Sequence, residues 1–151
     1  MRAATAALAA VAVCVATSGC ESGAEKVAEK QLASAQRQVQ CTTAAKAVSL
    51  PATGVPANLP LPPMAVIFHL EDRGRDGLVV SAVTTTSFKD VLAAMNAGYS
   101  VDGFKITGGE TEKHDAEANW TGDGYRGRWA IREIGAQCPG ETLVSILVAH
   151  V

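Results

Sequence analysis

Alternating apolar and polar residues dominate the second half of this chain and predict a domain rich in β-strands. The segments 64–72, MAVIFHLED, and 78–86, LVVSAVTTT, are rich in β-branched residues and are separated by RGRDG. Within that interval, Asp76-Gly77 is typical of the turn of a β-hairpin. We therefore predict two neighbouring antiparallel strands. The alternation places His69 on the face opposite three apolar residues: Val66, Phe68 and Leu70.

The clearest alternation surrounds a second turn dipeptide, Asp123-Gly124. A two-residue turn here predicts that Trp120 lies opposite Gly127, Ala118 opposite Trp129, Asn119 opposite Arg128 and Asp115 opposite Arg132. This single register makes one face of the hairpin apolar and the other polar, with a charge pair on the polar face. The agreement between turn and pattern therefore predicts a hairpin over this segment.

Residues 87–98 carry the signals of a short helix. The sequence SFKD, from Ser87 to Asp90, has the form of a capping box with Asp in place of the usual Glu. The predicted helix carries its apolar residues on one face: Phe88, Val91, Leu92 and Met95. Gly98 stands where the C-terminus of a helix favours a residue in the left-handed conformation.

The last strand and the order of elements define the fold class. The segment 142–151, TLVSILVAHV, is apolar on both faces and predicts an interior strand. The order is β-β-α-β-β-β, and the pattern leaves open a short extra strand near Phe104. We therefore predict an α+β domain over residues 64–151, with a small antiparallel sheet and one helix packed on a face.

Two segments precede this domain. Residues 20–40 hold a predicted tether helix with strong helix formers, and its apolar residues recur at helical spacing: Ala24, Ala28, Leu32, Ala35 and Val39. This narrow stripe favours a helix lying loosely on its own domain over a coiled-coil seam, with freedom of movement mainly in residues 21–40. Five of the six prolines lie between Ser49 and Pro63, so residues 41–63 are predicted to form an extended connector.

The N-terminus has the pattern of a secretory signal peptide over residues 1–19. Arg2 precedes an uncharged run rich in Ala and Val, which is too short to span a bilayer as a helix and ends at the tetrapeptide TSGC. This ending resembles the lipobox of bacterial lipoproteins, with Thr17 where leucine is usual. The resemblance implies cleavage before Cys20 and attachment of diacylglycerol to its sulfur. An ordinary secreted protein and an uncleaved signal anchor are the alternatives.

The resemblance also predicts a location. Acyl chains on Cys20 would hold the protein on the outer face of the cytoplasmic membrane, or in an outer membrane where the cell has one. Removal of residues 1–19 leaves 12 Lys and Arg against 15 Asp and Glu, a net charge of about −3, which argues against nucleic acid as a partner. From Asp90 to Trp129 the sequence is similar to other small bacterial lipoproteins of unknown function, so this similarity implies no activity.

Cysteine usage predicts one disulfide. Cys14 leaves with the signal peptide and Cys20 carries the lipid, so Cys41 and Cys138 remain. In an oxidising, exported compartment such a pair most simply forms a disulfide, and two unpaired buried thiols are the alternative. Closure of so long a loop stabilises a fold by up to about 4–5 kcal/mol in the chain-entropy model. With this bond formed, the connector is expected to lie against the domain as a strap.

The sequence offers little catalytic or metal-binding chemistry. The three histidines, His69, His114 and His150, show no zinc-ligand spacing, and the acidic loop 108–117 lacks the ligand pattern of a calcium loop. No hydrolase nucleophile motif and no phosphate-binding glycine loop is present. We therefore predict that the chain is not an enzyme and has no catalytic residue, no metal and no cofactor.

One surface is a candidate for binding. The polar face of the second hairpin and its surroundings hold Tyr99, Tyr125, Arg126, Arg128 and Arg132. Arginine beside aromatic residues is typical of binding hot spots. The pattern favours a different interpretation, in which the face is solvated, its arginines pair with Asp115 and neighbouring carboxylates, and the tryptophans fill the core.

These observations favour a non-catalytic interaction module of the cell envelope, anchored to the membrane through Cys20. The alternative is a carrier of a small or lipidic ligand held between helix and sheet. The predicted partner is accordingly an envelope protein or a small apolar ligand.

Residues 50–54, LPATG, match the pattern by which sortases attach proteins covalently to cell walls. A sortase signal stands near the C-terminus, before an apolar segment and a basic tail, whereas 97 residues follow Gly54 in this chain. We therefore interpret LPATG as part of the connector.

Overall fold

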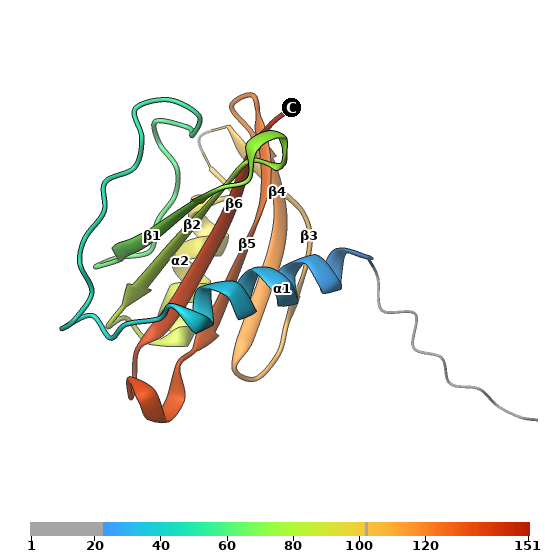
Figure 1. Ribbon diagram of the computed structural model, residues 1–151. Helices are drawn as coiled ribbons and strands as arrows, with labels where there is room; N and C mark the ends of the chain where they lie inside the picture. The colour runs from blue at the N-terminus through green and yellow to red at the C-terminus, as the bar shows by residue number, and fades with distance from the viewer. Residues whose placement is uncertain (1–22, 102) are drawn as a thin grey trace, which may run out of the picture.

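Six antiparallel strands form one sheet that carries a helix on each face (Figure 1). The computed structural model describes residues 23–101 and 103–151, so the predicted signal peptide and Cys20 lie outside the described residues. The elements in chain order are α1 (Gly23–Arg37), β1 (Val66–Asp72), the 3₁₀ turn η1 (Gly74–Asp76), β2 (Leu78–Thr84), α2 (Phe88–Gly98), β3 (Phe104–Thr111), β4 (Asp115–Gly122), β5 (Tyr125–Glu133), the 3₁₀ turn η2 (Gly135–Gln137) and β6 (Thr142–His150).

The strand order β1-β2-β6-β5-β4-β3 confirms the predicted α+β fold class with an antiparallel sheet. β6 lies between β2 and β5, and its residues 142–146 are all buried, so the prediction of an interior strand is correct. The sequence left open only a short strand near Phe104, whereas β3 runs for eight residues along the sheet edge beside β4. The full order of elements in the domain is therefore β-β-α-β-β-β-β.

The β4–β5 hairpin has the register that its turn predicts. All four predicted cross-strand pairs are present: Trp120 with Gly127, Ala118 with Trp129, Asn119 with Arg128, and Asp115 with Arg132. Asp123 and Gly124 have φ values of 54° and 79°, as a two-residue turn that matches the strand twist requires. The predicted β1–β2 pair is present as well, with η1 forming most of its turn.

β1 departs from the predicted alternation because it contains a bulge. Its pairing with β2 shifts between Ile67 and His69, so Phe68 is the extra residue. Ile67 and Leu70 contact the core on the α2 side of the sheet, whereas Phe68 contacts the cluster on the α1 side. The prediction that Phe68 and Leu70 share a face is therefore wrong.

α2 begins at the predicted cap. The hydroxyl of Ser87 accepts a hydrogen bond from the backbone N–H of Asp90 at 3.3 Å. The helix ends at Gly98, but this residue does not have a positive φ, so the predicted left-handed conformation is wrong. A Cβ at Gly98 would lie 2.8 Å from Cβ of Pro60 in the connector. Close packing of the connector therefore accounts for a glycine at this position.

α1 packs on the opposite face of the sheet from α2. Leu32, Ala35 and Val39 are buried together with Ala130 of β5 and Leu143 of β6. This stripe is the described part of the predicted apolar stripe, and it lies on the chain's own sheet. The interpretation that this helix lies on its own domain is therefore confirmed, and the expected freedom of movement in residues 21–40 stays a prediction.

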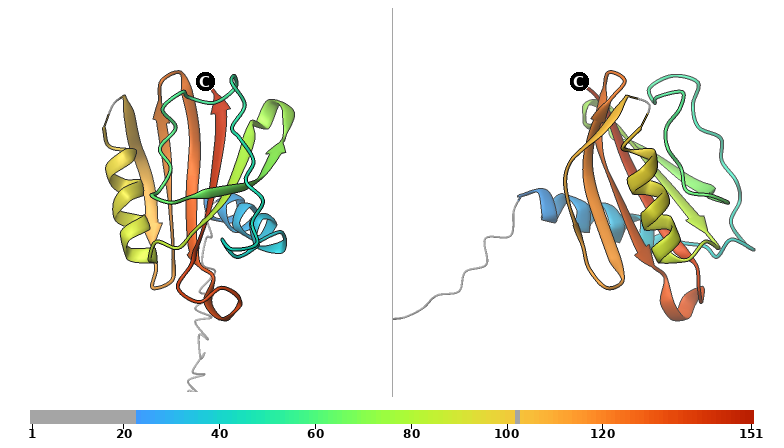
Figure 2. Two further views of the ribbon diagram at one scale, coloured as in Figure 1. Left: turned by 90° about the vertical axis from the view of Figure 1, so that its left-hand side faces the viewer. Right: turned by 180° about the vertical axis from the view of Figure 1, so that it is seen from behind.

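The connector lies on the same side of the sheet as α2. Val55 and Leu59 are buried in the core that α2 covers, and Leu50 and Leu61 pack against that core. The right-hand view in Figure 2 shows α1 on one side of the sheet and α2 with the connector on the other. The connector therefore covers part of the larger core as a strap.

Candidate functional site

The apolar face of the β4–β5 hairpin forms the centre of the larger core. Trp120 and Trp129 are each 1% exposed, and the ring of Tyr99 lies 5.1 Å from that of Trp120. The absence of a side chain at Gly127 permits this packing, since a Cβ there would lie 2.7 Å from Cζ2 of Trp120. The interpretation that the tryptophans fill the core is therefore confirmed, and Tyr99 belongs to the core as well.

The polar face of the same hairpin is a network of paired side chains. Arg128 is 5% exposed, its Nε donates to Oδ1 of Asn119 at 2.9 Å, and its Nη1 lies 2.9 Å from Oε1 of Glu117. Nη2 of Arg132 lies 3.5 Å from Oδ2 of Asp115. The favoured interpretation, in which the arginines pair with neighbouring carboxylates, is therefore correct for these two arginines.

The residues proposed from the sequence as a binding surface do not form one surface. Tyr125 packs against the core on the α2 side of the sheet. Arg132 lies beside α1 and donates from Nη1 to Oε1 of Gln36 at 3.2 Å. Strand geometry explains the separation, because neighbouring residues face opposite sides and six residues of β-strand span about 20 Å. Arg126 and Arg128 alone share a surface.

Those two arginines line a depression of about 490 Å³ on the α1 side of the sheet. Arg75, from the β1–β2 turn, lines it too, and we call it the arginine-lined depression after these three residues. Its other polar side chains are Asp76, Thr107, Asn119 and Thr121. Leu147 and Ala149 of β6 add apolar surface. The lining therefore draws on the β1–β2 turn and on four strands.

The pairing of β6 with both neighbours brings Arg75 to the two β5 arginines. Leu78 of β2 and Gly127 of β5 both pair with Val148. The β1–β2 turn therefore lies at the same end of the sheet as the start of β5. Arg75 was missing from the candidate site predicted from the sequence, because the segment RGRDG that contains it predicts only a turn. The signal that could have found it is the strand order, which the sequence pattern does not specify.

The charges of the arginine-lined depression are unbalanced. Arg75 and Arg126 are exposed, and neither forms an ion pair within the described part of the chain. Asp76 is the single carboxylate among the lining residues. The site thus offers guanidinium, amide and hydroxyl donors in one hollow, which is the chemistry of an anion-binding site.

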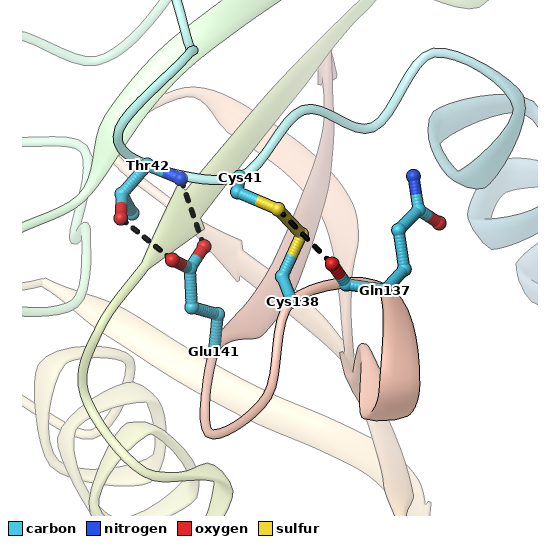
Figure 3. Close-up of a disulfide and its surroundings, with 5 residues drawn as sticks. All are labelled: Cys41, Thr42, Gln137, Cys138 and Glu141. Atoms are coloured by element: carbon cyan, nitrogen blue, oxygen red, sulfur yellow. Dashed lines mark hydrogen bonds between the residues drawn. A yellow bond between two sulfur atoms is a disulfide. The ribbon is translucent and has the colours of Figure 1, made fainter.

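The predicted disulfide joins the start of the connector to the β5–β6 loop (Figure 3). Cys41 and Cys138 are 97 positions apart in the sequence, and their Cα atoms are 5.4 Å apart, within the usual range for this bond. Glu141 reinforces the junction, because its carboxylate accepts hydrogen bonds from the backbone N–H and the hydroxyl of Thr42 at 2.8 and 2.7 Å. The prediction of this disulfide is confirmed.

The same junction brings together three side chains of types that can bind metal ions. The sulfurs of Cys41 and Cys138 and a carboxylate oxygen of Glu141 all lie within 4.8 Å of one another. The sulfurs are bonded to each other, so they are not thiolates, and Sγ of Cys41 also lies 3.3 Å from the carbonyl oxygen of Gln137. The arrangement is therefore a structural junction and not a metal centre while the disulfide is intact.

A second depression, of about 520 Å³, lies beneath the connector. Pro51, Thr53 and Gly54 of the LPATG segment form one side of it, and Leu70 and Val148 are among the sheet residues on the other. Neither this hollow nor the arginine-lined depression includes a residue of α2 in its lining. The LPATG segment therefore contributes to a surface of the folded domain.

The three histidines lie far from one another. Nδ1 of His114 lies 2.7 Å from Oε2 of Glu133 at the end of β5. The ring of His150 stacks on that of Tyr125, with centroids 4.3 Å apart. His69 lies in β1, which β2 separates from β6, the strand of His150, and His114 lies in the turn between β3 and β4 at the opposite edge of the sheet. No pair of them shares a site within the described residues.

Within residues 23–101 and 103–151, three buried donors of the larger core have no hydrogen-bond partner: the hydroxyl of Tyr99 and the Nε1–H groups of Trp120 and Trp129. Burial raises the pKa of the Tyr99 hydroxyl, so this group stays protonated. An unpaired buried donor costs about 1–3 kcal/mol. These groups therefore lie in the core that α2 and the connector cover, without an acceptor among the described residues.

No protein-family model, no curated protein and no solved structure matches this chain. Among the described residues, each helix is too short or too polar to cross a bilayer.

Proposed function

We propose that this chain is a lipid-anchored, extracytoplasmic lipoprotein that acts as a non-catalytic binding module of the cell envelope. The disulfide between Cys41 and Cys138 is the observation that carries this proposal. Such bonds persist in oxidising compartments outside the cytoplasm, which is the destination that the TSGC signal implies. The anchor is Cys20, held on the outer face of the membrane by its acyl chains.

The packing of α1 supports a short tether. Only Glu21 and Ser22 separate Cys20 from the first residue of α1, and the buried side chains of that helix attach it to the sheet. The domain is therefore held close to the headgroups and not at the end of a long stalk. A binding module in this position meets ligands at the membrane surface.

The arginine-lined depression supports binding as the activity. Its lining holds guanidinium, amide and hydroxyl groups, with the exposed Asp76 as its single carboxylate, and includes no histidine, cysteine or serine. These groups bind anions by charge-assisted hydrogen bonds, and reaction chemistry usually needs a positioned base or nucleophile as well. We therefore assign the depression as the binding site of the module.

The anchor is tested by Cys20→Ala, with Cys14→Ala as the matched control. We expect the first variant to accumulate as an uncut precursor or to leave the membrane fraction, because the acyl chains are lost. The second variant should be processed and fractionate like the parent chain. Unchanged processing and fractionation of Cys20→Ala would refute lipidation.

The binding site is tested by placing a photo-crosslinking residue at Thr121, which lines the depression, or at Lys89, which is exposed on α2. In intact envelopes we expect a reproducible adduct from position 121 and none from position 89. Thr121 lies in β4 and lines the depression on the α1 side of the sheet, whereas Lys89 lies on α2, which covers the other side. Identical adducts from both positions, or none from either, would count against the depression as the site.

A carrier of a small or lipidic ligand, held between α2 and the sheet, is the second candidate. The three unpaired donors in that interface favour it, because a ligand oxygen there would accept their hydrogen bonds. Native mass spectrometry of the full chain should then show an added mass that organic extraction removes. A chain that is empty in both measurements would exclude this candidate.

A further inference from the structure

We propose that the arginine-lined depression binds a phosphate ester. This inference rests on the proposed function in taking the depression as the binding site, and it names the class of ligand. The juxtaposition of Arg75 from the β1–β2 turn with Arg126 and Arg128 of β5 carries it. The chain as a whole has a net charge of −2, so this cluster is not a consequence of overall composition.

Two of the three guanidinium groups supply the charge. Arg75 and Arg126 are exposed and form no ion pair among the described residues. A guanidinium group presents a planar fork of N–H donors that matches two oxygens of a phosphate. Asp76 also lines the depression and offsets one of these two charges, so the unpaired groups of the lining keep a positive balance that favours an anion.

The third arginine orients a neutral donor. Nε of Arg128 donates to Oδ1 of Asn119 at 2.9 Å, which fixes that oxygen as an acceptor. The amide nitrogen of Asn119 is then the part of the side chain left to donate, and Asn119 lines the depression. The hydroxyls of Thr107 and Thr121 add donors from β3 and β4. Donors from several strands suit a tetrahedral oxyanion better than a flat carboxylate.

The size of the hollow points to an ester and not to a bare ion. Its volume of about 490 Å³ falls within the range of small-molecule sites, about 300–1,000 Å³. Leu147 and Ala149 give part of the lining an apolar character. The organic part of a phosphate ester would lie on these side chains while its phosphate faces the arginines.

On the outer face of the cytoplasmic membrane, a phosphate ester can belong to a phospholipid headgroup or to a soluble molecule. The depression lies on the same side of the sheet as α1, and the proposed lipid site precedes that helix by three residues. Both sources are therefore within reach of the site. The experiment has an arm for each.

The test titrates the full chain, in a non-ionic detergent, with inorganic phosphate, with glycerol 1-phosphate and with micelles doped with phosphatidylglycerol. NMR of the arginine Nε–H groups reports binding at the side chains themselves. We expect saturable shifts that the double variant Arg75→Gln, Arg126→Gln weakens by at least about tenfold, because charge-assisted contacts are strong. The control Arg37→Gln, Lys46→Gln removes the same charge from exposed positions outside the depression and should bind like the parent chain.

Each outcome decides the proposal. Saturable binding of glycerol 1-phosphate alone supports a soluble ester, and binding of phosphatidylglycerol alone supports a headgroup. The proposal is overturned by the absence of saturable shifts with every probe, or by equal binding of the glutamine double variant and its control. Undiminished binding by Arg75→Lys, Arg126→Lys, together with weakened binding by the glutamine double variant, would support the phosphate ester and assign the effect of the two side chains to their charge, since lysine also binds phosphate.

The failure of this inference is distinguishable from failure of the proposed function. Membrane attachment through Cys20 and the cross-link at Thr121 are measured separately from phosphate binding. If both persist while no phosphate probe binds, the ligand class is wrong and the binding module stands.

Discussion

Gln31 of α1 donates a hydrogen bond from Nε2 to the hydroxyl of Ser145 in β6 at 3.1 Å, across 114 positions of sequence. Both side chains are fully buried, and Oε1 of Gln31 has no partner. A polar pair in an apolar interface specifies one rotation of the helix on the sheet, because any other leaves both groups unpaired. The pair therefore attaches the N-terminal helix to the central strand.

The replacement Gln31→Ala is expected to lower the free energy of unfolding by about 1–3 kcal/mol, since it leaves the hydroxyl of Ser145 buried without a partner. Gln31→Met should lower the free energy of unfolding by less, because methionine keeps the volume of the side chain and removes the unpaired Oε1. Urea denaturation followed by tryptophan fluorescence measures both. Gln38→Ala, at an exposed position just beyond α1, is the control and should change stability by less than about 0.5 kcal/mol.

A loss in Gln38→Ala as large as that in Gln31→Ala would contradict this assignment. The effect would then be a general response to substitution at this end of the chain and not the loss of the buried hydrogen bond.

The sequence was sufficient to predict the structure wherever a turn motif agreed with the alternation of apolar and polar residues. The Asp123-Gly124 turn fixes the register of two strands, and the apolar face of that register, with Trp120 and Trp129, could be assigned before the structure was known. The disulfide followed from counting cysteines. The turn left one register that buries the apolar residues, and the assignment of two cysteines to the N-terminal signal left one pair.

The sequence was insufficient to predict features that depend on contacts between distant segments of the chain. The bulge places Phe68 on the opposite face of the sheet from the predicted one, and no glycine or other turn residue in the sequence indicates it. Gly98 is needed because Pro60 lies against the helix end. Arg75 joins the candidate site only through the pairing of β6 with two other strands. These features depend on strand order and on the path of the connector, which local propensity does not encode.

Removal of the disulfide by Cys41→Ala, Cys138→Ala is expected to lower the free energy of unfolding by about 2–5 kcal/mol. The bond closes a loop across 97 positions, so the unfolded chain gains much freedom without it. Urea denaturation with and without a reducing agent measures the loss. The reducing agent should destabilise the parent chain to the level of the variant and should leave the variant unchanged. A further shift of the variant under reduction would contradict the assignment.

Gly127→Ala is expected to destabilise the protein by about 1–3 kcal/mol through overpacking. A Cβ at this position would collide with the carbonyl oxygen of Leu147 in the neighbouring strand and lie 2.7 Å from Cζ2 of Trp120. Gly108→Ala is the control, since a Cβ at Gly108 meets nothing within 4 Å. Thermal unfolding compares the two variants. Equal midpoints of thermal unfolding for the two variants would contradict this prediction, because β5 would then accommodate the methyl group without loss of stability.

Glu71 and Arg73 form a local pair whose effect depends on pH. Nε of Arg73 donates to Oε1 of Glu71 at 2.9 Å and Nη2 donates to Oε2 at 3.2 Å. These hydrogen bonds hold the pKa of Glu71 below its ordinary value of 4.5, while partial burial opposes them. A lowered pKa in the folded state means that the stabilisation is present above the ordinary pKa and is lost as the pH falls through the folded value.

Arg73→Gln should therefore raise the pKa of Glu71, which carbon NMR of its carboxyl group measures directly. Because the side chain of Glu71 is 36% exposed, solvent screens the pair, and we expect a loss of only about 0.2–1 kcal/mol at neutral pH. The difference from the parent chain should shrink as the pH falls through the lowered pKa of Glu71. Arg75→Gln, two residues along the same turn, should leave the pKa of Glu71 unchanged. An equal rise in both variants would indicate a general field of positive charge and not the hydrogen bonds of Arg73.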